Sequence, residues 1–260
     1  YGYTELQLSN GMRVYVRPTT FADDEVRLKL FSMGGKNMYA DDDMPNLSYL
    51  ISGATVGGAG QFDELTLEKM IAGKPISIGP YIDDETEGME GSSNVKDLET
   101  LFQLLYLYFT QPRKDVEAFE NMMSQQEEFL KNAHVNPLIA YNDSLHKVAY
   151  QSDRLHSMNS ELLKKVNYDR ILQIYKERFA NAADFKLILT GNIDMVRLRP
   201  MLCKYVAVLP SNNHFEKVGT LGPNLVDGQV KKLFTKEQKT PSTTTTIVIK
   251  GKMDYNNRNE

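Results

Sequence analysis

The pattern of residues 26–33, VRLKLFSM, limits what this chain can fold into more than any other stretch. Apolar side chains at 26, 28 and 30 alternate with charged side chains at 27 and 29. Successive side chains of a β-strand point to opposite faces of its sheet. This period of two therefore predicts a strand that is buried on one face and exposed to water on the other.

Three further regions predict strands. The stretch LQLSNGMRVYV has two short apolar runs around Asn10-Gly11, a dipeptide that favours the positive φ angles of a type I′ hairpin turn. The stretches PISIGPYID and TEGMEGSSN predict two strands joined by an acidic turn. The apolar run in DFKLILTGN, residues 184–192, predicts a buried strand.

Stretches with apolar side chains at helical spacing lie between these strands. Residues 44–60, MPNLSYLISGATVGGAG, predict an amphipathic helix that follows a polar loop and runs into a glycine-rich bend. Thr66 is expected to cap a helix that ends near Gly73, and Asn94 to cap a long apolar helix that Pro112 terminates. Further helices are expected at 115–132, 137–150, 159–165 and 168–179, and a last one is expected to be capped by Asp194.

The composition changes after Pro210. Residues 1–211 are expected to form one α+β domain. Residues 212–260 are expected to hold a linker and the first β-hairpin of a next domain, with strands in VKKLFTK and TTTTIVIKGKM. Because a lone hairpin is barely stable in water, we expect that the chain is cut from a longer protein.

Bulk properties exclude several classes of function. The net charge of −4 and the pI of about 5.7 give no sign of a strong basic face, so no nucleic-acid partner is expected. No apolar run approaches the roughly 18 residues of a membrane span, so none is expected. The single cysteine, Cys203, excludes an internal disulfide and a cysteine-based zinc site. Its neighbours have the spacing of a helical core stripe, so we expect Cys203 to pack as a small buried residue.

The sequence shows no catalytic constellation of its own. The four histidines do not form a pair at i, i+4 with an acid between them, and they are expected to be surface residues: His134, His146, His156 and His214. No Gly-x-Ser-x-Gly elbow presents a nucleophile. VGGAGQ lacks the Gly-Lys-Ser/Thr of a phosphate loop, and the acidic runs at 41–43 and 83–87 lack the spacing of a calcium loop.

The order of these elements resembles the pitrilysin/insulinase family of zinc metallopeptidases. LSNGMRVYV is similar to the family's opening hairpin, and SMGGKNMYADDDMPNLSYLIS to its strand, loop and active-site helix. KDLETLFQLLYLYFTQPRKDVEAFE is similar to its paired helices. The stretch from residue 168 to Pro210, helix, strand, Gly-Asn and helix, is the most specific. The resemblance covers nearly all of residues 5–252 and implies a mixed, mainly antiparallel sheet with helices packed on one face.

Active members of the family carry His-x-x-Glu-His on the first long helix, and a distal glutamate completes the zinc site. The resemblance places Ser48, Ile51 and Ser52 at these three positions, and no histidine occurs before residue 134. Glu127 and Glu128 stand near the position of the distal glutamate and are expected on a charged outer helix face. The resemblance therefore assigns no catalytic, metal-binding or substrate-binding residue to this sequence.

The resemblance implies a non-catalytic half of a bacterial, periplasmic zinc metalloendopeptidase. Such a half forms one wall of a chamber that encloses the peptide, with the sheet facing the chamber. Its partners would be the peptide and the catalytic half of the same protein, which holds the zinc. A stand-alone non-catalytic subunit, like a respiratory core protein or the inactive partner of a processing peptidase, is the alternative. An unrelated α+β binding domain is a third possibility.

Overall fold

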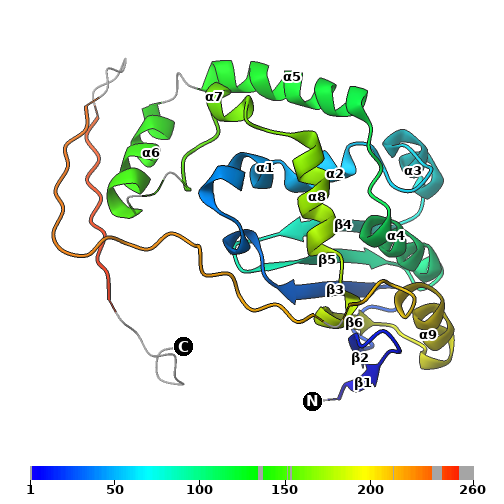
Figure 1. Cartoon of the computed structure of the whole chain (residues 1–260). Helices are drawn as coiled ribbons and strands as arrows, with labels where there is room; N and C mark the ends of the chain where they lie inside the picture. The colour runs from blue at the N-terminus through cyan, green and yellow to red at the C-terminus, as the bar shows by residue number, and fades with distance from the viewer. Residues whose placement is uncertain are drawn as a thin grey trace.

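A six-stranded mixed sheet organises the structure, with the strand order β1-β2-β6-β3-β5-β4 (Figure 1). The computed structural model describes residues 2–133, 137–150, 152, 154–212, 214–235 and 242–251. The strands are β1 (Thr4–Gln7), β2 (Arg13–Pro18), β3 (Val26–Met33), β4 (Ser77–Ile82), β5 (Thr86–Ser93) and β6 (Lys186–Gly191). Only the β2–β6 pair is parallel, and the other pairs are antiparallel. The predicted fold class, α+β with a mixed and mainly antiparallel sheet, is confirmed.

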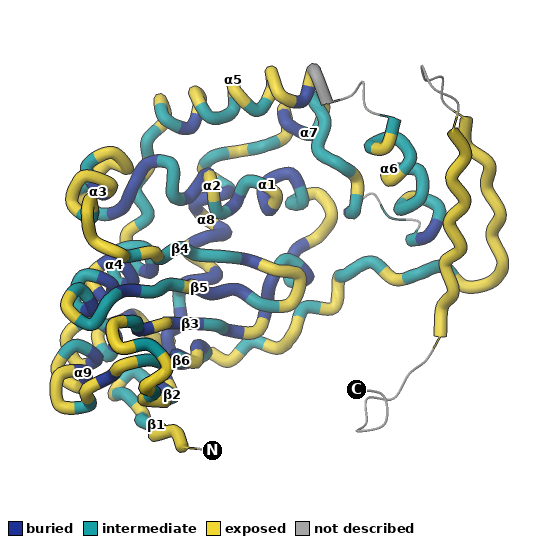
Figure 2. Tube along the Cα trace, turned by 180° about the vertical axis from the view of Figure 1, so that it is seen from behind, coloured by how far each residue is buried: buried dark blue, intermediate teal, exposed yellow. Residues whose placement is uncertain are grey.

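The alternation in 26–33 corresponds to β3, one of the central strands. Val26, Leu28 and Leu30 are buried, whereas Arg27 and Lys29 point to water. Buried side chains of β2 and β6 extend the same apolar face. No helix of the described residues covers the opposite face of the sheet, and the strands lie toward the viewer in Figure 2.

Helices cover the buried face of the sheet (Figure 1). The α-helices are α1 (Met44–Ser48), α2 (Leu50–Thr55), α3 (Glu64–Ile71), α4 (Leu98–Thr110), α5 (Val116–Ala133), α6 (Pro137–Tyr150), α7 (Ser160–Leu163), α8 (Tyr168–Arg178) and α9 (Met195–Met201). Short 3-10 turns are η1 (Lys36–Met38), η2 (Asp41–Asp43) and η3 (Ala182–Asp184), and a π-helical turn η4 (Leu202–Val206) follows α9. None of the helices in the described residues is long and apolar enough to cross a bilayer.

The core lies between the sheet and helices α4 and α8. Phe109, Phe179 and Phe185 form a cluster in which each pair of ring centroids lies 5.3–5.8 Å apart. Tyr175 is fully buried beside them, and its hydroxyl donates a hydrogen bond to the carbonyl of Tyr108 at 2.8 Å. Burial of these rings supplies much of the apolar area that stabilises the domain.

Three local predictions are wrong in detail. The hairpin does not turn on Asn10-Gly11: Gly11 N–H donates to the carbonyl of Leu8, so Ser9 and Asn10 are the central turn residues. Gly11 follows them at φ 90°, which is typical of a three-residue loop. The side-chain amide of Asn10 instead donates to the carbonyls of Val206 and Leu209, which ties the hairpin to the end of the last helical segment.

The other two errors concern helix starts. Asp63, rather than Thr66, caps α3, because the Asp63 carboxylate accepts from the Thr66 N–H at 2.7 Å. The helix α4 begins at Leu98, and the Asn94 side chain accepts from the N–H of Asp97 within the turn before it. The Asp63 cap therefore starts α3 a few residues earlier than predicted, and the turn at Asn94 starts α4 a few residues later.

The last helix is predicted correctly, but its cysteine is not. Asp194 caps α9 by accepting from the N–H of Val196 at 2.8 Å. Cys203 lies in η4 and is exposed, contrary to the expectation of a packing residue. The π-helical turn follows Pro200 and turns Leu202 and Val206 inward, which leaves Cys203 on the outer side.

The predicted linker is not a free tether. We call residues 214–227 the strap, because backbone bonds fix it along its length: Glu216 N–H to the Asp184 carboxylate, Leu221 N–H to the Asn37 carbonyl, and Val226 N–H to the Ala149 carbonyl. Residues 230–235 and 242–251 form no strand, and the residues between them lie outside the described part of the chain. The division at residue 211 and the start of a second domain stay predictions.

Candidate functional site

The helix that the resemblance aligns with a zinc helix is interrupted. Tyr49 separates α1 from α2 with φ −112° and ψ 14°. Ser48 and Ser52 are exposed, and their hydroxyls donate back to the carbonyls of Met44 and Tyr49. Ile51 is half-buried against the core. These side chains serve the helix and its packing, and the i, i+4 geometry that a zinc pair needs is broken between them.

The acidic and imidazole groups considered in the sequence do not gather at this helix. Glu127 ion-pairs with Lys131 one turn along α5 at 3.2 Å, and Glu128 is also on α5. His146 Nδ1 lies 3.2 Å from the carbonyl of Leu155. Among the described residues, no three His, Cys, Asp or Glu side chains lie together as metal ligands.

Two more histidines are placed, and one is not. His156 Nδ1 lies 3.3 Å from the carboxylate of Asp143, while His214 is exposed in the strap. His146 lies on α6 and contacts the carbonyl of Leu155, the residue before His156, in the loop after that helix. His134 lies outside the described residues.

A buried charge cluster was not foreseen from the sequence. Glu87 on β5 is only 1 % exposed, and its carboxylate accepts from the N–H of Gly35 at 2.5 Å. The guanidinium of Arg178 approaches it to 3.8 Å but makes its close contacts, at 2.5 and 2.8 Å, with Glu216 of the strap. Burial raises the pKa of Glu87 to about 7, and the Gly35 N–H and Arg178 oppose that rise only in part. The cluster fastens the strap and leaves Glu87 as an underpaired carboxylate.

One face of the sheet has no covering layer among the described residues, and we call it the open face. The strand registers align its outward side chains in transverse rows. One row runs Glu5, Tyr15, Ile188, Lys29, Glu90 and Gly79. The row on one side of it runs Gln7, Arg13, Lys186, Phe31, Gly88 and Tyr81, and the row on the other side runs Arg17, Thr190, Arg27, Ser92 and Ser77.

The open face is basic, although the chain as a whole is acidic. Exposed strand residues supply five cations and two carboxylates: Arg13, Arg17, Arg27, Lys29, Lys186, Glu5 and Glu90. The net charge of −4 hides this separation. Alternation along each strand was a partial signal, because these seven charged residues fall on the exposed side of their strands.

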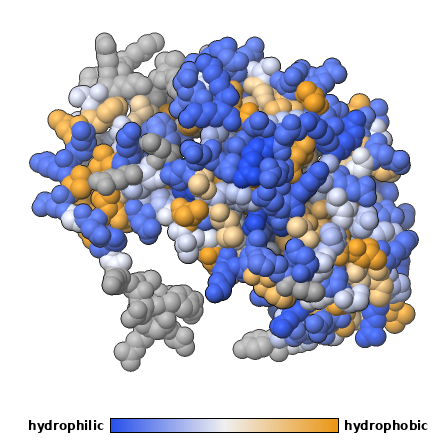
Figure 3. Space-filling view, viewed as in Figure 1, coloured by the Kyte–Doolittle hydropathy of each residue, from blue (hydrophilic) through white to orange (hydrophobic). Residues whose placement is uncertain are grey.

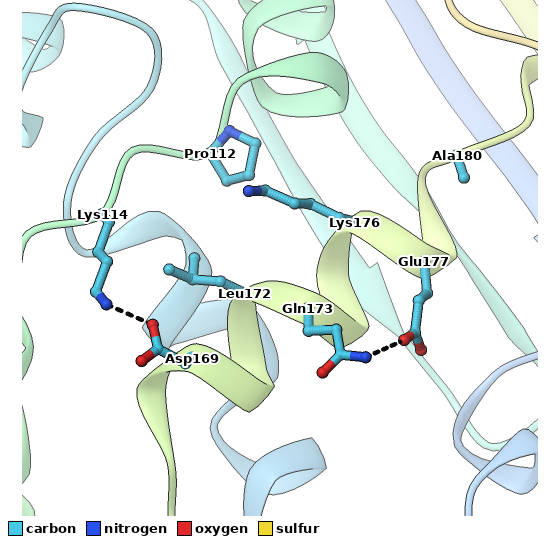
Figure 4. Close-up of a pocket in the computed structure, with 8 residues that line it drawn as sticks. All are labelled: Pro112, Lys114, Asp169, Leu172, Gln173, Lys176, Glu177 and Ala180. Atoms are coloured by element: carbon cyan, nitrogen blue, oxygen red, sulfur yellow. Dashed lines mark hydrogen bonds and ion pairs between the residues drawn. The ribbon is translucent and has the colours of Figure 1, made fainter.

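Shallow depressions mark both sides of the sheet. One of about 440 Å³ lies on the open face between β3, β5 and β6, lined by Arg27, Lys29, Ser77, Glu90, Ile188 and Thr190. Another, of about 590 Å³, follows α8 on the helical side (Figure 4). In the second, Lys114 pairs with Asp169, and the Gln173 amide donates to Glu177. Neither depression presents a nucleophile with an adjacent base.

No sequence-family profile matches the chain. Curated relatives do: a zinc protease PQQL-like protein of Arabidopsis thaliana is 26% identical over 211 residues, and a probable zinc protease PqqL of Haemophilus influenzae is 20% identical over 209. These matches cover 80% of this chain. The chain spans only about a fifth of the length of either relative, 20% and 22%.

Solved structures share the fold. The periplasmic protease PqqL of Escherichia coli matches with a TM-score of 0.72 and 17% identity, over 84% of this chain and 24% of that one. The ferredoxin protease FusC, solved with Arabidopsis ferredoxin, matches with a TM-score of 0.69 and 18% identity, again over 84% of this chain and 24% of that one. A peptidase M16 inactive domain of Pseudomonas fluorescens matches with a TM-score of 0.65 and 14% identity, over 84% of this chain and 53% of that one. The sequence relatives, both called zinc proteases, and the shared fold support the resemblance to the pitrilysin/insulinase family of zinc metallopeptidases.

Proposed function

We propose that this domain forms part of the wall of a peptide-enclosing chamber in a larger zinc metallopeptidase, and that it takes no part in the chemistry. The observation that carries the proposal is the sheet with one covered face and one open face. A six-stranded sheet with one open face offers a surface against which an extended peptide can lie. The zinc and its activated water belong to another part of the parent protein.

The side chains at the zinc-helix positions support a structural role. The hydroxyls of Ser48 and Ser52 donate to carbonyls of the helix backbone, and among the described residues no three His, Cys, Asp or Glu side chains gather as metal ligands. Neutral hydroxyls that already donate to carbonyls are poor ligands for zinc, which prefers Cys, His and carboxylate groups. This chemistry supports the proposed non-catalytic role.

The catalytic half of the same protein is the partner that we propose, and a periplasmic location in a bacterium is the setting. The share of the relatives that the chain spans, about a fifth, supports a larger parent. The description of the Escherichia coli protein as periplasmic supports the location. Apolar side chains near the chain's end support a following domain that would cover them, since Leu233, Ile247 and Ile249 are 80–89 % exposed. Figure 3 shows apolar side chains gathered at that side of the molecule.

A stand-alone non-catalytic subunit remains the second candidate. It would use the same domain without a catalytic partner in the same chain. The parent gene discriminates between the two, because only the first candidate requires a His-x-x-Glu-His segment upstream of this domain.

The test compares the 260-residue chain with the parent protein. The chain alone is expected to show no peptide hydrolysis in the presence of zinc, while the parent hydrolyses peptides. An Ile188→Asp change in the parent places a carboxylate on the open face. It should lower kcat/KM for peptides and leave zinc content unchanged, whereas a Leu65→Asp control on the exposed side of α3 should change neither. Hydrolysis by the chain alone, or an equal effect of both changes, would contradict the proposal.

A further inference from the structure

The charge arrangement of the open face points to the chemistry of its ligand. We propose that three cations, Arg13, Arg17 and Lys186, bind an extended peptide segment that is rich in Asp and Glu. This inference rests on the proposed function, because it takes the open face as the surface that meets the peptide. It adds a substrate preference that the absence of a zinc site does not give.

The three cations differ from the other two on the same face. Lys29 donates to Glu90 at 2.6 Å, and Arg27 donates to Glu25 at 2.8 Å, so both have a carboxylate partner already. No ion pair involves Arg13, Arg17 or Lys186 within the described part of the chain. Unneutralised cations on one surface create a positive potential that attracts and orients an acidic ligand.

The spacing of these cations fits an extended chain. Arg13 and Arg17 lie four residues apart on β2, which places them about 13 Å apart on the same face at roughly 3.3 Å per residue. A peptide running along β2 would bring carboxylates four positions apart to the same two groups. Lys186 is the register partner of Arg13 on β6, so the first carboxylate meets two cations.

Aromatic side chains line the same rows. Lys186 Nζ lies 5.7 Å from the ring centroid of Phe31, and Lys29 Nζ lies 5.5 Å from that of Tyr81. Gly88 stands between Phe31 and Tyr81 in the transverse row. The row that holds Arg13 and Lys186 therefore continues into two aromatic residues, next to which an apolar side chain of the peptide can pack.

The β4 edge of the sheet is a weaker place for the peptide than the open face. Just after β4, the N–H of Asp83 donates to the carbonyl of Thr86, which directs the backbone groups of odd-numbered β4 residues toward β5 and those of even-numbered residues toward the outer edge. Pro80 is even-numbered and has no N–H, so the edge lacks a donor at its middle. A peptide strand added beside β4 would lack the hydrogen bond from residue 80, which favours the open face over the β4 edge.

The test measures peptide binding to the 260-residue chain by fluorescence anisotropy. The probes are three labelled peptides of equal length on a Gly/Ser background, with Glu, Lys or Gln at positions i and i+4. The Glu peptide is expected to bind best, and added salt should weaken it. A triple variant, Arg13→Gln/Arg17→Gln/Lys186→Gln, should weaken Glu-peptide binding about tenfold or more.

The matched control is Lys165→Gln/Arg197→Gln/Arg199→Gln, which removes the same charge from exposed helical and loop positions. It should leave binding unchanged, and circular dichroism should show both variants folded. Equal binding of the Glu and Lys peptides, or an equal loss in both variants, would overturn the proposal. Tighter binding of a single-stranded oligonucleotide would overturn it in favour of nucleic acid. None of these results bears on zinc content or hydrolysis, so they leave the proposed function to its own test.

Discussion

The buried carboxylate Glu87 should make this fold less stable as the pH rises. Its pKa is about 7 in the folded chain, against an ordinary value of 4.5, because burial disfavours the anion. Below pH 4.5 both states hold the proton, and Glu87 has no effect. Between 4.5 and 7 only the unfolded state releases it, so the free energy of unfolding falls with pH and levels off above 7.

The size of the loss follows from the two pKa values. A difference of about 2.5 units, at roughly 1.4 kcal/mol per unit, gives an upper limit of about 3.5 kcal/mol. The side chain is 1 % exposed, so solvent screens little of this. Arg178 offsets only part of it, because its close contacts are with Glu216.

The variant Glu87→Gln removes the titrating group and keeps an acceptor for the Gly35 N–H. The free energy of unfolding would be measured in urea at pH 5 and pH 8. Between these two pH values, the difference between the variant and the wild type should change by about 1–3 kcal/mol in favour of the variant. Glu90→Gln, exposed on the same strand, is the control, and its free energy of unfolding should change with pH as that of the wild type does. Parallel curves for Glu87→Gln and the wild type would refute the reasoning.

Two further outcomes test the packing around α8 and η4. Tyr175→Phe should lower the free energy of unfolding by about 1 kcal/mol, because the buried carbonyl of Tyr108 loses its donor; an unchanged denaturant midpoint would contradict this. Cys203 should react fully with a thiol reagent in the native chain at the rate of an exposed thiol, and a thiol that reacts only after unfolding would place it in the core instead.

Most of the secondary structure could be predicted from local patterns. The strand at 26–33 and the strand in 184–192 were predicted because their periodicity is set by burial, which is a local property of each strand. The helices at 137–150 and 168–179 were also predicted, and Asn167, not foreseen as a cap, caps the second. The errors at Asn10-Gly11 and Thr66 concern which of several polar residues closes a turn, and that choice depends on contacts made elsewhere.

The features that could not be predicted depend on distant parts of the chain meeting. Glu87, Arg178 and Glu216 come from a strand, a helix and the strap, and nothing in their local sequence marks them as partners. The basic open face likewise needs the strand order and register, since β2 and β6 are far apart in sequence. The exposure of Cys203 depends on the π-helical turn that follows Pro200, which apolar spacing alone does not show.

Zinc content tests most directly whether this domain contributes a surface in place of a reactive centre. The purified 260-residue chain would be incubated with excess zinc, gel-filtered and measured by elemental mass spectrometry beside the parent protein. The parent is expected to retain its zinc, and the isolated chain to retain only a small fraction of an equivalent. One tightly held zinc per chain, lost on substitution within residues 44–60 or 115–132, would contradict the account.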